Sequence, residues 1–157
     1  MKRTFFSLAL LLAVATLTAQ TKMTAREAAV KIADRILAST TYEFKNTKTG
    51  EIYKSVKKLP LDMDVKVACK YNNWHYTNGV TNMALMELGD KLGDKKYEKY
   101  VLKNMNFVFN EGNLDFFRKQ YDEAFKRDGW NAVRKLSWHM IFRGKRLDDN
   151  GPMGASL

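Results

Sequence analysis

The sequence has little of the residues that most often hold metal ions or close disulfides. It contains one cysteine, Cys69, and two histidines, His75 and His139. A single thiol forms no intramolecular disulfide and no thiolate zinc site, and two histidines are too few for a histidine metal site. The sequence also lacks a phosphate-cradling glycine loop, a serine elbow and zinc-ligand spacing. We therefore expect no metal and no cofactor, and we expect Cys69 to be a small buried residue.

A long hydrophobic run is also missing. Residues 5–15 are apolar, but a membrane-spanning helix needs about 20 such residues. Lys2 and Arg3 precede this run and a small-residue stretch, 16–20, follows it, which is the order of a secretory signal. We predict a signal peptide at residues 1–20 and an exported protein, either periplasmic or secreted. A retained N-terminal anchor is the alternative.

Acidic residues are fewer than basic ones. The chain has 17 Asp and Glu residues against 27 Lys and Arg residues, a net charge of +10, and the loss of Lys2 and Arg3 with the signal leaves +8. Such a balance favours anionic partners, namely nucleic acid, anionic lipid or acidic sugars. Export makes nucleic acid the weakest of these candidates. A basic surface that serves only solubility is the alternative reading.

Helical periodicity covers most of the remaining chain. Thr24 and Glu27 form a capping box, and apolar residues then recur at helical spacing to residue 39. Residues 40–73 read as a long connection that contains short strands or a helical turn. From residue 74 the chain reads as helical again. One apolar stripe is interrupted by Gly89 and ended by Gly93, and it consists of Val80, Ala84, Leu85, Leu88 and Leu92. Asp94 then caps the next helix. The turn is so short that these two helices must lie antiparallel.

The last third of the chain contains further helical segments. Asn113 begins a helix that Gly129 breaks, and residues 130–142 read as a shorter element. A basic loop, 143–146, follows. Pro152 suits the first turn of another helix, with Asp149 or Asn150 as its cap. Because the sequence stops as it enters this helix, we expect residues 21–157 to be the N-terminal part of a larger domain.

Three motifs occur in series: WHYTNGV at residues 74–80, LGDKKY at 92–97 and LDDNGPM at 147–153. In this order they resemble family 105 glycoside hydrolases, with family 88 as the nearest relative. The resemblance covers essentially all of residues 21–157. It implies an all-α fold, an incomplete (α/α)6 barrel that comprises about the first five helices. A complete barrel of twelve helices needs on the order of 300 residues.

The resemblance also implies an unusual hydrolase chemistry. These families act on unsaturated rhamnogalacturonyl and glucuronyl sugars, the disaccharides and oligosaccharides that polysaccharide lyases leave with a C4=C5 double bond. A carboxylic acid protonates C4, water adds at C5, and the resulting hemiketal opens to release the neighbouring sugar. The acid must carry a proton at the working pH, so its pKa should be raised. We expect the fragment alone to be inactive.

Two aspartates in the third motif are the catalytic candidates. Asp149 matches the carboxylate that the family uses in its active site, and the adjacent Asp148 would brace the turn. The family's principal acid lies in a later Trp-x-Asp segment that this sequence lacks, which makes Asp149 the supporting carboxylate; an alignment shifted by one motif would make Asp149 the acid itself. A helix cap is the structural alternative for these aspartates.

Four further residues are candidates for substrate binding. The rings of Trp74 and Tyr76 suit stacking against sugars, although core packing is the usual fate of aromatic residues. Arg146 in the basic loop suits a bidentate contact with a uronate carboxylate, although a solvated turn explains it as well. His139 is the fourth, with a hydrogen-bonded structural role as its alternative. An exported helical module that binds acidic polysaccharide without catalysis remains the second functional hypothesis.

Overall fold

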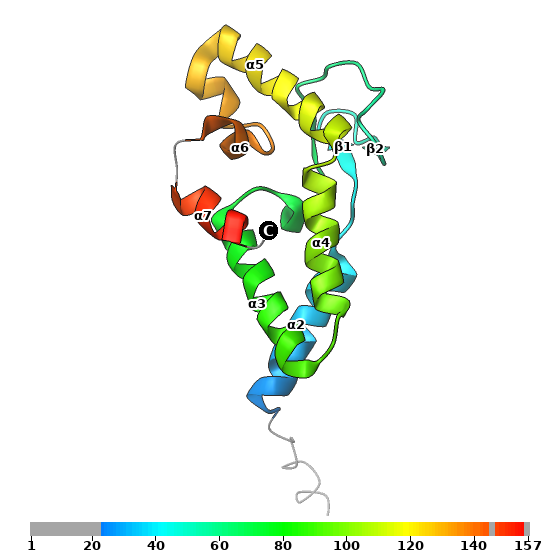
Figure 1. Ribbon diagram of the computed structural model, residues 1–157. Helices are drawn as coiled ribbons and strands as arrows, with labels where there is room; N and C mark the ends of the chain where they lie inside the picture. The colour runs from blue at the N-terminus through cyan, green and yellow to red at the C-terminus, as the bar shows by residue number, and fades with distance from the viewer. Residues whose placement is uncertain (1–22, 145–146, 156–157) are drawn as a thin grey trace, which may run out of the picture. The chain divides into compact units, whose positions relative to one another are not determined.

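The computed structural model describes residues 23–144 and 147–155, except for the side chains of residues 147–149. These residues form six α-helices, a short 3-10 helix and a three-stranded sheet (Figure 1). None of the helices in this part of the chain is long and apolar enough to cross a membrane. The chain divides into two units, Met1–Ile32 and Ala33–Leu157. The predicted signal peptide, residues 1–20, lies outside the described residues.

The described part of the first unit is the start of helix α2, Ala25–Ser39. The Thr24 backbone N–H donates to Glu27 Oε2 at 2.8 Å, and the Glu27 N–H donates to Thr24 Oγ1 at 3.2 Å. These reciprocal bonds satisfy amide groups that have no partner within the helix. The predicted capping box is therefore confirmed.

In the second unit, helices α3 (Tyr76–Leu92) and α4 (Lys96–Val108) form the predicted hairpin (Figure 1). Gly93 ends α3 in the left-handed conformation, with φ of 66°. The Asp94 amide donates to the Gly89 carbonyl, and the Asp94 carboxylate accepts from the Lys96 amide at 3.0 Å. Gly89 lies inside α3, where an added methyl carbon would lie 3.1 Å from the Asp94 carbonyl oxygen, so the bare backbone allows the turn to close tightly over it.

The predicted all-α class needs a correction at residues 44–67. Strands β1 (Phe44–Asn46), β2 (Ile52–Tyr53) and β3 (Val65–Val67) form an antiparallel sheet in the order β2-β1-β3. The 3-10 helix η1, Lys70–Asn72, follows. The protein is thus mostly helical, with a small sheet in the segment read as a connection.

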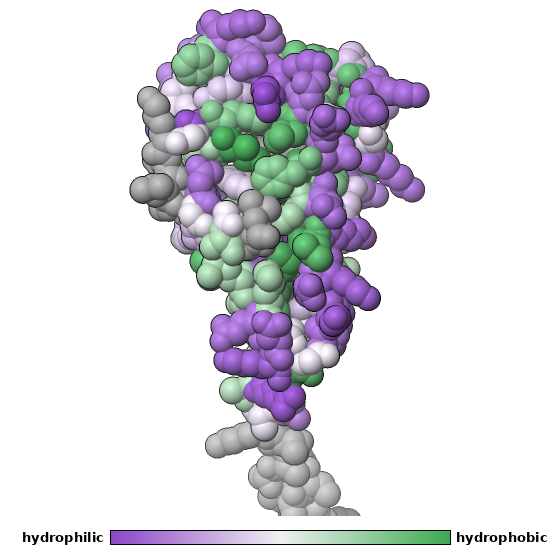
Figure 2. All heavy atoms as spheres, viewed as in Figure 1, coloured by the Kyte–Doolittle hydropathy of each residue, from purple (hydrophilic) through white to green (hydrophobic). Residues whose placement is uncertain are grey.

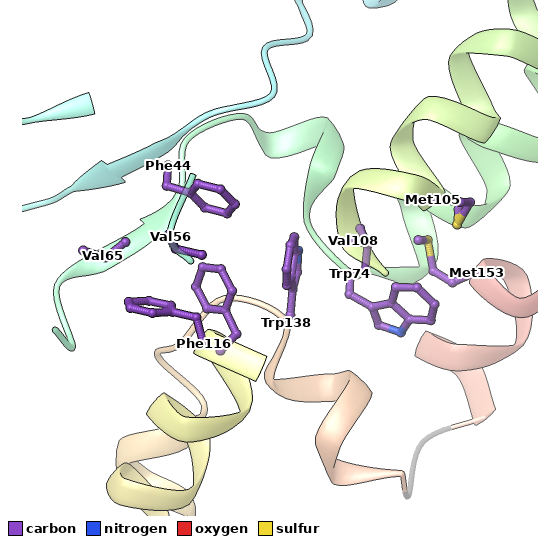
Figure 3. Packing of buried hydrophobic residues seen from close by; sticks show 10 residues of the cluster. Phe44, Val56, Val65, Trp74, Met105, Val108, Phe116, Trp138 and Met153 are labelled. Carbon is purple, nitrogen blue, oxygen red and sulfur yellow. The ribbon is translucent and has the colours of Figure 1, made fainter. Parts of the chain in front are cut away.

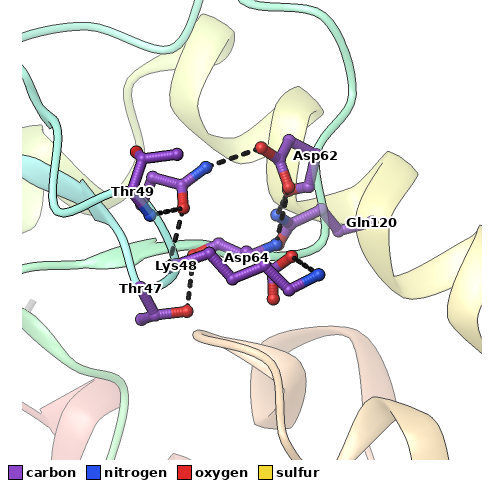
Figure 4. A network of polar contacts seen from close by, with 7 residues as sticks. Thr47, Lys48, Thr49, Asp62, Asp64 and Gln120 are labelled. Atoms are coloured by element: carbon purple, nitrogen blue, oxygen red, sulfur yellow. Dashed lines mark hydrogen bonds and ion pairs between the residues drawn. The ribbon is translucent and has the colours of Figure 1, made fainter.

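Side chains rather than long strands hold this sheet together (Figure 4). Asn46 Oδ1 accepts from the backbone amides of Lys48 and Thr49, and its Nδ2 donates to Asp62 at 2.7 Å. The buried amide of Gln120 donates to the carbonyls of Asp62 and Val65. These bonds replace backbone pairing that three-residue strands cannot supply.

Three helices complete the chain: α5 (Glu111–Val133), α6 (His139–Arg143) and α7 (Leu147–Ala155). The break predicted at Gly129 is present, since Asp128 and Gly129 have non-helical backbone angles inside α5. Three boundaries differ from the prediction, the first being the start of α5 at Glu111 instead of Asn113. Residues 130–142 contain a turn before α6, and α7 begins at Leu147, which places Pro152 inside the helix instead of in its first turn.

The largest core cluster joins the sheet to helices α4, α5 and α7 and to the residues that precede α3 and α6 (Figure 3). Trp138 lies at its centre, 4.7 Å from the Phe117 ring and 6.3 Å from the Phe44 ring, measured between centroids. Its indole N–H donates to the Asn72 carbonyl at 2.8 Å. The cluster contains Phe44, Val56, Val65, Trp74, Met105, Val108, Phe116, Phe117, Trp138 and Met153.

Candidate functional site

The first and third sequence motifs meet where the N-terminal end of α3 packs against α7. The indole N–H of Trp74, which is only 7% exposed, donates to Asn150 Oδ1 at 2.7 Å. A buried indole N–H needs such a partner, because leaving it unpaired costs about 1–3 kcal/mol. The bond therefore ties the Asn150 side chain of the third motif to Trp74, two residues before α3.

A glycine in α3 allows the two helices to pack closely at this junction. A methyl carbon added at Gly79 would lie 2.5 Å from the backbone nitrogen of Met153, a distance that real side chains do not adopt. Helix α7 therefore packs directly on the backbone of α3, and Met153 reaches the same core cluster as Trp74 (Figure 3). The two motifs are parts of one packed junction, although 76 residues separate Trp74 from Asn150.

The predicted catalytic residues lie beside this junction along the chain. Asp148 and Asp149 belong to the first turn of α7, directly before Asn150, but their side chains are outside the described part of the structure. Arg146 lies outside the described residues altogether. The roles predicted for these three residues stay predictions.

The two aromatic candidates have different environments. Trp74 is buried, with the Phe109 ring edge-on at 5.5 Å, whereas Tyr76 is 46% exposed and begins α3. His75 caps the helix, since its Nδ1 accepts from the Thr77 amide, and its ring lies 4.7 Å from that of Tyr76. Tyr76 thus presents an accessible ring, while Trp74 acts here as a packed hydrogen-bond donor.

His139 belongs to another cluster. Its Nδ1 lies 2.7 Å from the Leu136 carbonyl oxygen, and its ring lies edge-on to Trp130. The Arg143 guanidinium stacks over the same Trp130 ring at 3.6 Å. These contacts connect α6 to the end of α5, and they account for the position of His139 without a substrate.

The second motif forms a polar contact with the C-terminal part of α2. Lys96 Nζ lies 2.8 Å from Asp34 Oδ1, and the Tyr97 hydroxyl donates to the same oxygen at 3.0 Å. The hydrogen bond from Lys96, supplemented by that from Tyr97, holds the pKa of Asp34 below its ordinary value. Burial raises the pKa of Tyr97, whose ring is fully buried. This motif therefore holds helices together.

Helix α3 also exposes large apolar side chains. Tyr76, Val80, Met83 and Met86 recur at helical spacing and are between 38% and 52% exposed. We call these four residues the α3 stripe. On the face seen in Figure 2, hydrophobic residues gather in the middle, with hydrophilic residues above them and to their right. Val80 was predicted to share one apolar stripe with Leu85, but only Leu85 is buried.

An open groove of about 790 Å³, which the sequence did not indicate, lies between residues 56–61 and the start of α5. Phe109 lines this groove and also touches Trp74, so the groove adjoins the motif junction. Its charged lining residues are Lys57, Glu111, Asp115, Arg118 and Lys119. They come from two segments about sixty positions apart, which explains why no local motif revealed them.

Comparison with known proteins leaves the family assignment open. No protein-family model matches the sequence, and neither a curated protein nor a solved structure matches the chain. The resemblance to family 105 and 88 glycoside hydrolases therefore rests on the three motifs, two of which meet at the packed junction of α3 and α7.

Proposed function

We propose that the helices of residues 33–155 are the first part of an (α/α)6 barrel hydrolase that acts on unsaturated uronyl oligosaccharides. The observation that carries the proposal is the α3 stripe. Helix α3 already packs against α4 and α7, yet it exposes four further large apolar side chains at helical spacing. A patch of this kind on a monomeric domain marks a surface that is covered by another element or partner.

An inner barrel helix would explain both faces of α3. Inner helices contact an outer helix on one side and neighbouring inner helices on the others, so they need apolar or small residues nearly all round. Outer helices need only one apolar face. Helix α4 fits the outer type, since it buries Tyr97, Val101 and Met105 and exposes lysines.

The motif junction supports the placement of the catalytic carboxylate. In the proposed enzyme the bond between Trp74 and Asn150 positions the backbone turn that carries Asp149. Asp149 then orients the uronide and stabilises the positive charge that develops when C4 is protonated. Water adds at C5, and collapse of the hemiketal releases the neighbouring sugar, a route distinct from displacement at C1.

The test is the loss of ultraviolet absorbance from an unsaturated pectin disaccharide, because hydration removes the C4=C5 double bond. We expect no loss with this chain alone. We expect loss with a gene product that carries this chain together with the remaining helices of the barrel, the principal acid included. Absence of loss with every unsaturated uronide, in a folded product of that length, overturns the proposed function.

A substitution at Asp149 sharpens the test. In the active product, Asp149→Asn should lower kcat by about 100-fold or more, since a positioned carboxylate contributes on that scale. The matched control is Asp122→Asn, which removes an exposed carboxylate from the middle of α5 and should leave kcat unchanged. Equal activity of the two variants would remove Asp149 from the catalytic site.

A further inference from the structure

We propose that the groove between residues 56–61 and the start of α5 binds sugar residues of an acidic oligosaccharide, beyond the ring that reacts. The inference rests on the proposed function for the identity of the sugar, but it concerns a different surface. The groove of about 790 Å³ has a size typical of small-ligand sites, which span roughly 300–1,000 Å³.

Phe109 connects the groove to the motif junction. Its ring is held edge-on against Trp74 at an interplanar angle of 86°, and 41% of the residue is still exposed. An aromatic face carries partial negative charge and attracts the C–H groups of a sugar ring. Because Trp74 also binds Asn150, a continuous series of contacts leads from the third motif to the groove.

The charges of the groove favour an anionic ligand. Lys57, Arg118 and Lys119 face two carboxylates, Glu111 and Asp115, so the lining carries one excess positive charge. Lys119 is paired with Asp115 at 2.8 Å, whereas Lys57 forms no ion pair with any residue that the structure describes. A uronate carboxylate at Lys57 would supply that partner, and the remaining carboxylates can accept hydrogen bonds from sugar hydroxyls.

The walls of the groove are closely fitted at Gly112. A methyl carbon added there would lie 3.2 Å from Lys57 Cβ and Cγ, so the bare backbone lets the Lys57 stem lie against the first turn of α5. This contact restricts the stem while leaving the ammonium group exposed. Lys57 is thus placed in advance for a ligand, which reduces the entropy lost on binding.

The experiment titrates the chain with a saturated trigalacturonate and follows backbone amide shifts by NMR. We expect shifts at residues 56–61 and 109–119, weaker binding as salt is raised, and little binding of a neutral galactan trisaccharide. Lys57→Gln should weaken binding about threefold, the loss expected for one exposed ion pair, whereas Lys58→Gln in the same segment should not. Phe109→Ala should also weaken binding, unlike Phe125→Ala, a similarly exposed control.

Equal effects of the Lys57 and Lys58 substitutions, shifts elsewhere, or equal binding of the neutral sugar would each overturn the inference. An acidic peptide that shifts the groove residues when trigalacturonate does not would also overturn it. The outcome is separable from that of the proposed function. Hydrolysis by the longer product without groove binding refutes only this inference, and groove binding without hydrolysis refutes only the enzyme.

Discussion

Helices α3 and α4 form one hairpin, but they differ in the kinds of residue that they bury and expose. Helix α4 buries Tyr97, Tyr100, Val101, Met105 and Val108 and exposes Lys96, Lys99 and Lys103. Helix α3 buries two glycines, Gly79 and Gly89, with Asn82 and Leu85, and it exposes the α3 stripe. The packed side of α3 thus combines two glycines with Asn82 and Leu85, while four other large apolar residues face outward.

The difference shows what each helix packs against. The buried face of α4 fills space with aromatic and aliphatic side chains, as a helix on the outside of a core does. The buried face of α3 instead admits the backbone of α7 at Gly79 and the Asp94 carbonyl oxygen at Gly89. Helix α3 thus packs closely against other backbone on one face and exposes apolar side chains on another. Both properties are expected of a helix that has neighbours on more than one side.

The strongest test of this difference is to add a side chain at a glycine on the buried face of α3. Gly79→Ala places a carbon too close to the α7 backbone, so we expect the free energy of unfolding to fall by about 3 kcal/mol, as for severe overpacking. Chemical denaturation measures this decrease in the free energy of unfolding. Gly151→Ala is the control, because a carbon added there meets nothing within 4 Å. Similar stabilities of the two variants would mean that α7 does not pack on α3.

The stripe gives the next test. In this chain, Met83→Gln should change the free energy of unfolding by less than about 0.5 kcal/mol but should reduce self-association in sedimentation experiments. In a longer product that covers the stripe, the same change should cost about 2 kcal/mol, because it buries an amide. Leu102→Gln on α4, which replaces a residue 52% exposed, should have little effect in either protein. A large loss at Leu102 would make α4 the covered helix instead.

The smallest effect concerns the polar contact at the base of the hairpin. The hydrogen bonds from Lys96 and Tyr97 lower the pKa of Asp34, so the carboxylate stabilises the fold above its unfolded pKa of about 3.9. This contribution is lost as the pH falls through the lower folded pKa. The urea midpoint of Asp34→Asn should therefore lie below that of the parent at neutral pH and converge with it in acid. Asp90→Asn, at an exposed site, is the control and should leave the urea midpoint at neutral pH close to that of the parent.

The helices that the sequence predicted well are those with local start and stop signals. Thr24 and Glu27 begin α2, and Gly93 with Asp94 separates α3 from α4, all through contacts within a few residues. The sheet was left only as an open possibility, because strands of two or three residues pair across longer distances. Asn46 and Gln120 stabilise it through contacts that no local pattern reveals.

The candidate site was predictable only in its parts. The motifs that contain Trp74 and Asn150 were recognised in series, but their hydrogen bond depends on the packing of α7 over Gly79. Val80 was assigned to the same apolar stripe as Leu85 although it is exposed, because periodicity marks apolar positions without stating which face is covered. The groove was missed because Lys57 and Arg118 come from segments that only the fold brings together.

The amide of Gln120 has a consequence for handling the protein. It binds the carbonyls on either side of residues 63–64, and Lys66 nearby donates its ammonium to the Lys135 carbonyl at 2.9 Å. Trypsin cuts after lysine, but only where the backbone can enter its cleft, so cleavage at Lys66 requires this segment to detach from α5 first. The rate of tryptic nicking there would report how often the sheet separates from the helices.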